Sequence, residues 1–102
     1  MTVTTELSQD GKILTISIKG RFDFAKHLAF RESYERKDGK MPKSVVVDLK
    51  DATYLDSSAL GMLLLLRDHS GGDRSDIRVV NSSSDVRKIL AISNFDKLFD
   101  IS

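Results

Sequence analysis

The chain has 102 residues, with 16 Lys and Arg against 15 Asp and Glu, a formal net charge of +1 and no cysteine. This length predicts one domain over residues 1–102, because domains commonly run to about 100–150 residues. A hydrophobic content of 40% supplies one packed core and excludes wholesale disorder. The absence of cysteine excludes disulfides, a thiolate nucleophile and zinc sites with sulfur ligands. We therefore expect one folded domain that works without thiol chemistry.

The charge and hydropathy patterns bear on where in the cell the protein works and on which class of partner it binds. The longest apolar stretch, residues 59–66, contains Gly61 and is far shorter than the about 20 residues of a membrane-spanning helix. The first six residues lack the basic and apolar segments of a signal peptide. Residues 12–50 carry ten bases and five acids, but they show no aromatic stacking pattern like that of single-strand binders. We expect a cytoplasmic protein without membrane insertion, nucleic-acid contact, cofactor or metal.

The N-terminal half predicts a hairpin, a helix and a buried strand. Val3 and Leu7 indicate a short strand, and the Asp10-Gly11 turn leads into an alternating apolar pattern over residues 14–18, which Gly20 ends. Residues 24–37 combine helix formers with apolar side chains and stop near Gly39 and Pro42. The β-branched run 45–49 is typical of a strand covered on both faces.

The C-terminal half predicts a helix, a strand, a second helix and an apolar tail. The first helix follows Asp56 and runs to about His69, before two glycines. Residues 77–80 form a strand, and Ser84-Asp85 opens a helix with apolar positions at i, i+3 and i+4. Residues 95–101 form an apolar tail that we expect to dock on the core.

The order β-β-α-β-α-β-α predicts an α/β domain. Crossover helices make the strands at 14–18, 45–49 and 77–80 parallel, with right-handed connections. The loops 20–23, 51–56 and 81–84 then leave on one rim of the sheet, where ligands and partners of open α/β sheets tend to bind.

The segment of this rim with the most candidate functional residues is the start of the helix after Asp56. The Asp56 carboxylate suits an N-cap, because it can accept the free N–H groups of the first turn, and Ser57 would then expose its hydroxyl. By itself this pattern indicates only a good helix start. The helix is nevertheless apolar in almost every direction up to Arg67, which is hard to bury fully in so small a domain. We expect some of its leucines in the core and an exposed apolar strip beside Ser57 that includes Met62 and serves as a docking surface.

The Asp-Ser-Ser-Ala-Leu-Gly segment at residues 56–61 resembles the signature of bacterial anti-sigma factor antagonists of the STAS domain family, Asp-Ser-(Ser/Thr)-Gly-Leu-Gly. The Gly-Arg-Phe-Asp segment at 20–23 is similar to the family's Gly-Glu-(Leu/Ile)-Asp, and residues 86–90 with Phe95 resemble its closing helix. The resemblance spans the whole chain. It implies a STAS-like domain with a mixed sheet of four to five strands and helices packed mainly on one face. Ala59 replaces the usual Gly and Arg21 replaces an acid, a change that would alter partner choice.

The resemblance also implies phosphorylation-controlled partner switching by a protein that is monomeric when free. Ser57 is the phosphoacceptor that it implies, and the unmodified protein binds an anti-sigma factor, often itself a serine kinase, so that a sigma factor is released. A PP2C-type phosphatase resets the phosphorylated form. We expect partner binding at Asp23, Asp56, Ser58, Ala59 and Met62.

Two other functions remain open. Ser57 could form a hydrolase triad with His27 or His69 and an aspartate, but no Gly-x-Ser-x-Gly elbow or Walker motif is present, and His69 lies about 18 Å further along the same helix. Both histidines are interpreted as surface residues, and we expect no enzyme. Alternatively, the chain is a non-switching STAS subunit or scaffold that docks on a transporter ATPase or a sensory assembly. Ser57 favours the switch over that role.

Overall fold

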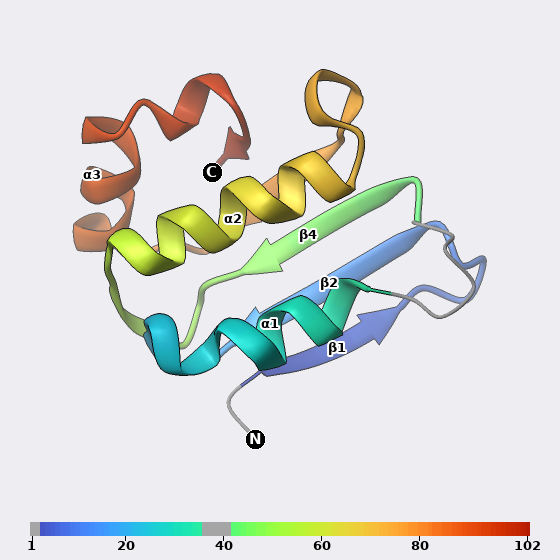
Figure 1. Cartoon of the computed structure of the whole chain (residues 1–102), viewed down its shortest axis with the longest axis horizontal. Helices are drawn as coiled ribbons and strands as arrows, with labels where there is room; N and C mark the ends of the chain where they lie inside the picture. Colours follow the sequence, from blue (N-terminus) through green and yellow to red (C-terminus); the bar gives the residue numbers. More distant parts are fainter. Residues whose placement is uncertain (1–2, 36–41) are drawn as a thin grey trace.

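A computed structural model describes residues 3–35 and 42–102 (Figure 1). The helices are α1 (His27–Tyr34), α2 (Ser57–His69) and α3 (Ser84–Ile92). The strands are β1 (Val3–Leu7), β2 (Ile13–Ile18), β3 (Gly20–Phe22), β4 (Ser44–Asp48), β5 (Ala52–Leu55), β6 (Ile77–Val80) and β7 (Asp100–Ile101). A 3-10 turn, Phe24–Lys26, precedes α1, and the end of the predicted helix at residues 36–37 lies outside the described residues.

The main sheet has the strand order β1-β2-β4-β6-β7. β1 pairs antiparallel with β2, whereas the β2–β4, β4–β6 and β6–β7 pairs are parallel. The predicted hairpin and the three parallel strands are therefore confirmed. The short edge strand β7 was not predicted, because two residues are too few to show the alternation of apolar and polar side chains that indicates a strand.

A second sheet, parallel β3–β5, was also missed. The sequence predicted that Gly20 ends a strand and that residues 51–56 form a loop. Instead, Gly20 takes a left-handed φ of +83°, which redirects the backbone into β3. This small sheet builds the rim, because both of its strands run directly into the elements that follow them.

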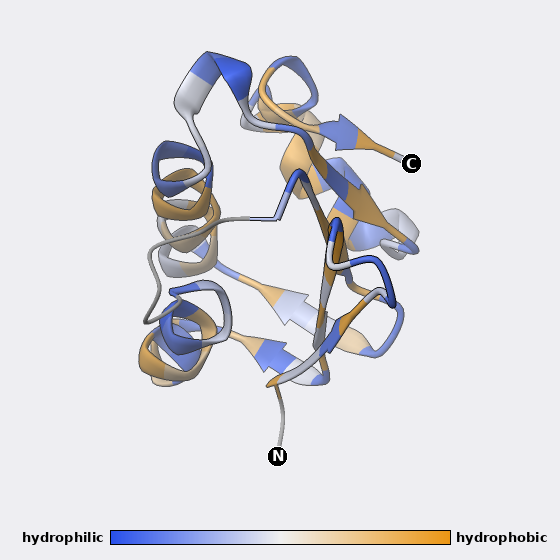
Figure 2. Ribbon diagram, turned by 90° about the vertical axis from the view of Figure 1, so that its right-hand side faces the viewer, coloured by the Kyte–Doolittle hydropathy of each residue, from blue (hydrophilic) through white to orange (hydrophobic). Residues whose placement is uncertain are grey.

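Helices α1 and α2 lie side by side over one face of the main sheet (Figures 1 and 2). The alternate residues of the central strands point toward them, and Ile16, Val47 and Val79 have no exposed surface. From α2, Leu63 and Leu66 are also fully buried. Each such side chain contributes about 1.5–3 kcal/mol by burial, so this layer holds the two helices in place.

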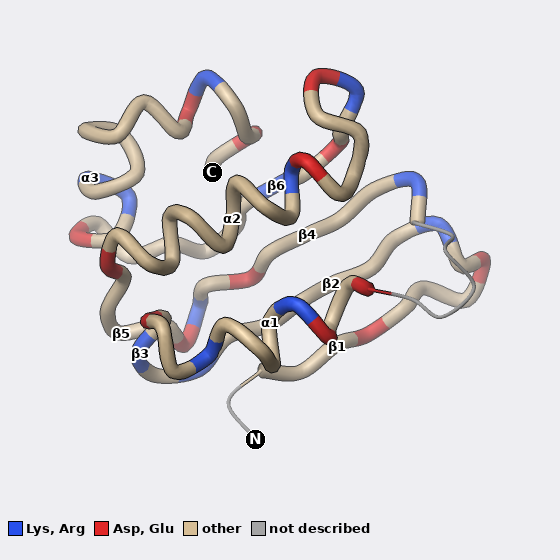
Figure 3. Tube along the Cα trace, viewed as in Figure 1, with Lys and Arg blue, Asp and Glu red and all other residues tan. Residues whose placement is uncertain are grey.

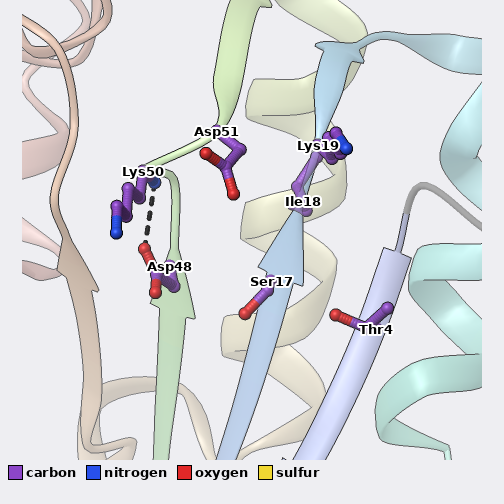
Figure 4. Close-up of a pocket in the computed structure, with 7 residues that line it drawn as sticks. All are labelled: Thr4, Ser17, Ile18, Lys19, Asp48, Lys50 and Asp51. Carbon is purple, nitrogen blue, oxygen red and sulfur yellow. Dashed lines mark hydrogen bonds between the residues drawn. The ribbon is translucent and has the colours of Figure 1, made fainter.

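The other face of the sheet is more open than the sequence indicated. Val46 is only half-buried, so the expectation that its strand is covered on both faces is wrong. The β-branched run is explained by its inward residues, Val45 and Val47, which pack under the helices. On the open face Ser17 pairs in register with Asp48, and a shallow polar pocket lies beside them, with Thr4 and Asp51 among its lining residues (Figure 4).

The C-terminal tail docks as predicted. Phe95 and Phe99 are 5% exposed each, and their rings stack with centroids 5.5 Å apart. The Ser83 hydroxyl caps α3 by accepting a hydrogen bond from the Val86 N–H at 3.2 Å. The tail therefore closes the core at the β6 edge.

Candidate functional site at the β3–β5 rim

Two parallel strands bring Asp23 and Asp56 to neighbouring positions. In the register of the small sheet Phe22 lies opposite Leu55, and each aspartate is the next residue along its strand. Neighbouring strands are about 4.8 Å apart, so the two carboxylates share one short rim. Phe22 and Leu55 are 0% and 2% exposed, and their burial fixes this rim to the core.

Asp56 is the N-cap of α2, as predicted. Its backbone is extended, and its carboxylate accepts a hydrogen bond from the Ala59 N–H at 3.0 Å. Ser57 is therefore the first residue of the helix, and it is exposed. Ser58 is half-buried behind it. The serine hydroxyl at position 57 lies where a kinase or a partner protein can reach it.

Asp23 has a similar capping role on the neighbouring strand. Its carboxylate accepts a hydrogen bond from the Ala25 N–H at 3.1 Å and lies 3.4 Å from the Arg21 Nε. The Arg21 guanidinium lies 4.4 Å from the centre of the Tyr54 ring, a cation–π distance. Lys26 donates a hydrogen bond to the Arg21 carbonyl. The rim thus combines two carboxylates with two cations, at the ends of β3 and β5 (Figure 3).

Two of the predicted partner-binding residues lie in the core. Ala59 is 0% exposed and Met62 is 6% exposed, so the expectation that Met62 belongs to an exposed strip is wrong. The reason is helical spacing: Met62 follows Ala59 by three residues and adjoins Leu63, and these positions form the stripe of α2 that faces the sheet. Asp23, Asp56, Ser57 and Ser58 remain accessible on the rim.

Different apolar side chains of the α1 and α2 region are exposed. On α2, Leu64 and Leu65 are 40% and 60% exposed; Phe24, in the turn before α1, is 64% exposed, and Leu28, in the first turn of α1, is 57% exposed. These four residues are called the α1–α2 apolar strip. Phe24 and Leu28 were overlooked because an i, i+4 apolar pair at the start of a helix ordinarily marks its buried face. Each of the two helices thus has apolar side chains that solvent can reach.

The histidines are not arranged around Ser57 as a triad. His69 occupies the opposite end of α2, where its ring lies 5.2 Å from that of Tyr34. His27 stacks on Phe24 with ring centroids 4.5 Å apart. Within residues 3–35 and 42–102, no three acidic or histidine side chains are grouped as metal ligands, and no helix has the length and apolarity of a membrane span.

Comparison with known proteins assigns the architecture to a family. A STAS-domain containing protein of Pseudomonas aeruginosa is 61% identical over 102 residues, covering all of both chains. The anti-sigma factor antagonist SpoIIAA, in its unphosphorylated form, superposes with a TM-score of 0.71 at 15% identity, over 98% of this chain and 86% of that one. A sulfate transporter family protein from Wolinella succinogenes superposes with a TM-score of 0.74 at 11% identity, over 93% and 80%. The STAS domain profile matches residues 4–102, and the chain therefore belongs to the STAS domain family.

Proposed function

We propose that this protein is an anti-sigma factor antagonist controlled by phosphorylation of Ser57. The unphosphorylated form binds an anti-sigma factor, and the bound anti-sigma factor releases its sigma factor. A serine kinase, which can be the anti-sigma factor itself, modifies Ser57 and ends the complex, and a PP2C-type phosphatase restores it. The observation that carries the proposal is the exposed Ser57 at a helix N-terminus, on the rim that also holds Asp23 and Asp56.

The geometry explains why a phosphate would break binding but preserve the fold. A phosphate adds about −1.5 to −2 charges and three acceptor oxygens. At the start of α2 the helix dipole and free N–H groups favour an anion, so the domain tolerates it. The partner would instead have to desolvate a dianion next to two carboxylates. A cost of only about 1.4 kcal/mol weakens a complex tenfold, and an unpaired buried charge costs more.

The structural neighbours support this proposal. SpoIIAA, whose fold this chain shares, has been solved both in an unphosphorylated form and, from Bacillus, in a phosphorylated form. The serine that follows the N-cap aspartate is present here and exposed. Arg21 stands where the family motif carries an acid, and we expect this difference to alter partner choice on the rim.

The test compares three variants in binding to the anti-sigma factor encoded in the same genome. Ser57→Ala should bind as tightly as the unmodified protein, and Ser57→Asp should bind at least tenfold more weakly, both with native circular dichroism. Ser84→Asp is the matched control, because Ser84 is also an exposed first residue of a helix and its N-cap is likewise satisfied. Equal binding by Ser57→Ala and Ser57→Asp would remove Ser57 from the mechanism.

A second function is favoured by the resemblance to the sulfate transporter family protein. In this alternative the domain is a constitutive accessory subunit or scaffold that docks on a transporter ATPase or a sensory assembly. Its complex would be insensitive to charge at Ser57, and the protein isolated from its own cells would carry no phosphate there. The same three variants therefore separate the two functions.

A further inference from the structure

The outer edge of the main sheet carries a second feature, remote from Ser57. Among the described residues β1 is a terminal strand of the sheet and pairs only with β2. The Ser8 N–H donates to the Ile13 carbonyl at 2.9 Å, so Ser8 points its backbone groups toward β2. Because backbone direction alternates along an antiparallel strand, Thr5 and Leu7 direct their N–H and C=O groups outward. This edge can accept another strand.

Several of the protections common in edge strands are missing from β1, whose one charged side chain is Glu6. Its sequence, Val-Thr-Thr-Glu-Leu, contains no proline and no lysine, and its five-residue register with β2 is free of bulges. Four of the five residues are exposed, and three of the five are β-branched. The strand is therefore long and regular enough to template an added one.

A groove runs along this edge between β1 and α1. It is lined by Val3 and Thr5 from the strand and by Ala29, Glu32 and Ser33 from the helix. Alternate side chains of an added strand would point into this groove, as they do where sheet-edge binding domains hold a peptide between a strand and a helix. The small Ala29 and Ser33, one helical turn apart, leave room for them.

The charges at the groove indicate what kind of segment can bind there. Glu32 lies in the groove and Glu6 is exposed on β1, while residues 1–11 contain two acids and no base. A second copy of β1, with Glu6 as its one charged side chain, would bring an acid to an acidic edge and supply no basic side chain. We propose that the β1–α1 groove binds an extended segment of a partner protein by addition of a strand to β1, with lysine or arginine side chains pointing into the groove toward Glu32 and β-branched residues on the other face. This interaction is independent of the Ser57 rim and leaves the free domain monomeric.

The proposal is tested by NMR titration of the ¹⁵N-labelled domain with an acetylated heptapeptide of alternating valine and lysine. Saturable shifts at β1 and at Ala29, Glu32 and Ser33 are expected, with a Kd below about 1 mM. The matched peptide of alternating valine and glutamate should bind at least about tenfold more weakly. Absence of saturable shifts, shifts centred elsewhere, or equal binding of the two peptides would overturn the proposal. Concentration-dependent shifts of β1 without peptide would also overturn it, since they would make a second copy the occupant.

Two variants separate strand addition from attraction of a basic peptide to any acid. Thr5→Pro removes an outward N–H without touching the bonds to β2, and it should abolish the shifts, whereas Thr5→Val keeps the edge and should bind as the parent does. Glu32→Lys should reverse the preference between the two peptides. If Thr5→Pro is folded by circular dichroism and still binds with unchanged affinity, strand addition is excluded. Ser57→Asp should bind like the parent, so that failure of this proposal and failure of the switch are distinguishable.

Discussion

Truncation of a side chain should cost much more stability on one face of α2 than on the other, and the size of each loss follows from how deeply the side chain is buried. Met62 is 6% exposed and Leu65 is 60% exposed, although only two residues separate them. Met62→Ala removes buried atoms and leaves a cavity, a change that costs about 2–5 kcal/mol in comparable cores. Leu65→Ala removes a side chain that is mostly in water, and a full leucine burial is worth only about 1.5–3 kcal/mol, so its loss should stay below about 1 kcal/mol.

Urea unfolding followed by far-UV circular dichroism measures this difference. Domains of this size have a free energy of unfolding of about 5–15 kcal/mol, so Met62→Ala should remain folded with a clearly lowered midpoint and an unchanged slope. In thermal unfolding each 1 kcal/mol corresponds to about 4–8 °C. Met62→Leu is the volume-conserving control and should cost less than about 1.5 kcal/mol.

The same pair of positions separates packing from docking. Leu65→Lys should leave stability within about 0.5 kcal/mol of the parent, as other exposed substitutions do, and should weaken binding to the anti-sigma factor. Met62→Lys should unfold the domain, because it buries an ammonium group in the core. Equal losses of stability at the two positions, or a larger loss at Leu65, would refute the assignment of the α2 faces.

Three further predictions concern the caps and a buried phenol. Asp56→Ala should lower the free energy of unfolding by about 1 kcal/mol through loss of the N-cap, whereas Asp56→Asn keeps an acceptor and should cost much less; equal losses in urea titrations would show that the cap is not what matters. Asp23→Asn likewise retains its cap to Ala25, so it should impair phosphorylation or partner binding more than the melting temperature, and a large melting shift would make Asp23 purely structural. Burial raises the pKa of Tyr34, so the unfolded state loses this proton first. The stability that Tyr34 contributes should be fully present below the ordinary tyrosine pKa of about 10 and should be lost as the pH rises above it, so Tyr34→Phe should reduce the fall in stability over that range in urea titrations at successive pH values.

The larger elements were predictable because their patterns are local. The alternation in β2, the β-branched run of β4 and the Asp56 cap each specify an element without reference to the rest of the chain. Crossover geometry then predicts that the three loops share one rim. The position of Ser57 on that rim therefore follows from the sequence.

The missed features depend on tertiary contacts. β3 and β5 have three and four residues, too few for a period, and they exist because Phe22 and Leu55 bury their side chains beside each other. In α2 nearly every direction is apolar, so no pattern distinguishes Met62 from Leu65, and only the position of the sheet decides which is buried. The exposure of Phe24 was not predictable either, because a phenylalanine at the start of a helix is ordinarily a core residue, whereas this one is 64% exposed.

The central claim is that Ser57 carries the switch, and intact mass with phosphopeptide mapping of the protein isolated from its own cells tests it most directly. The account predicts a phosphorylated fraction with the phosphate on Ser57, which disappears in a Ser57→Ala strain and on treatment with a PP2C-type phosphatase. Mapping should be repeated under conditions that activate and silence the controlled genes, and the phosphorylated fraction should change between them. Unmodified protein under all conditions, or a phosphate on another residue that persists in the Ser57→Ala strain, would contradict it.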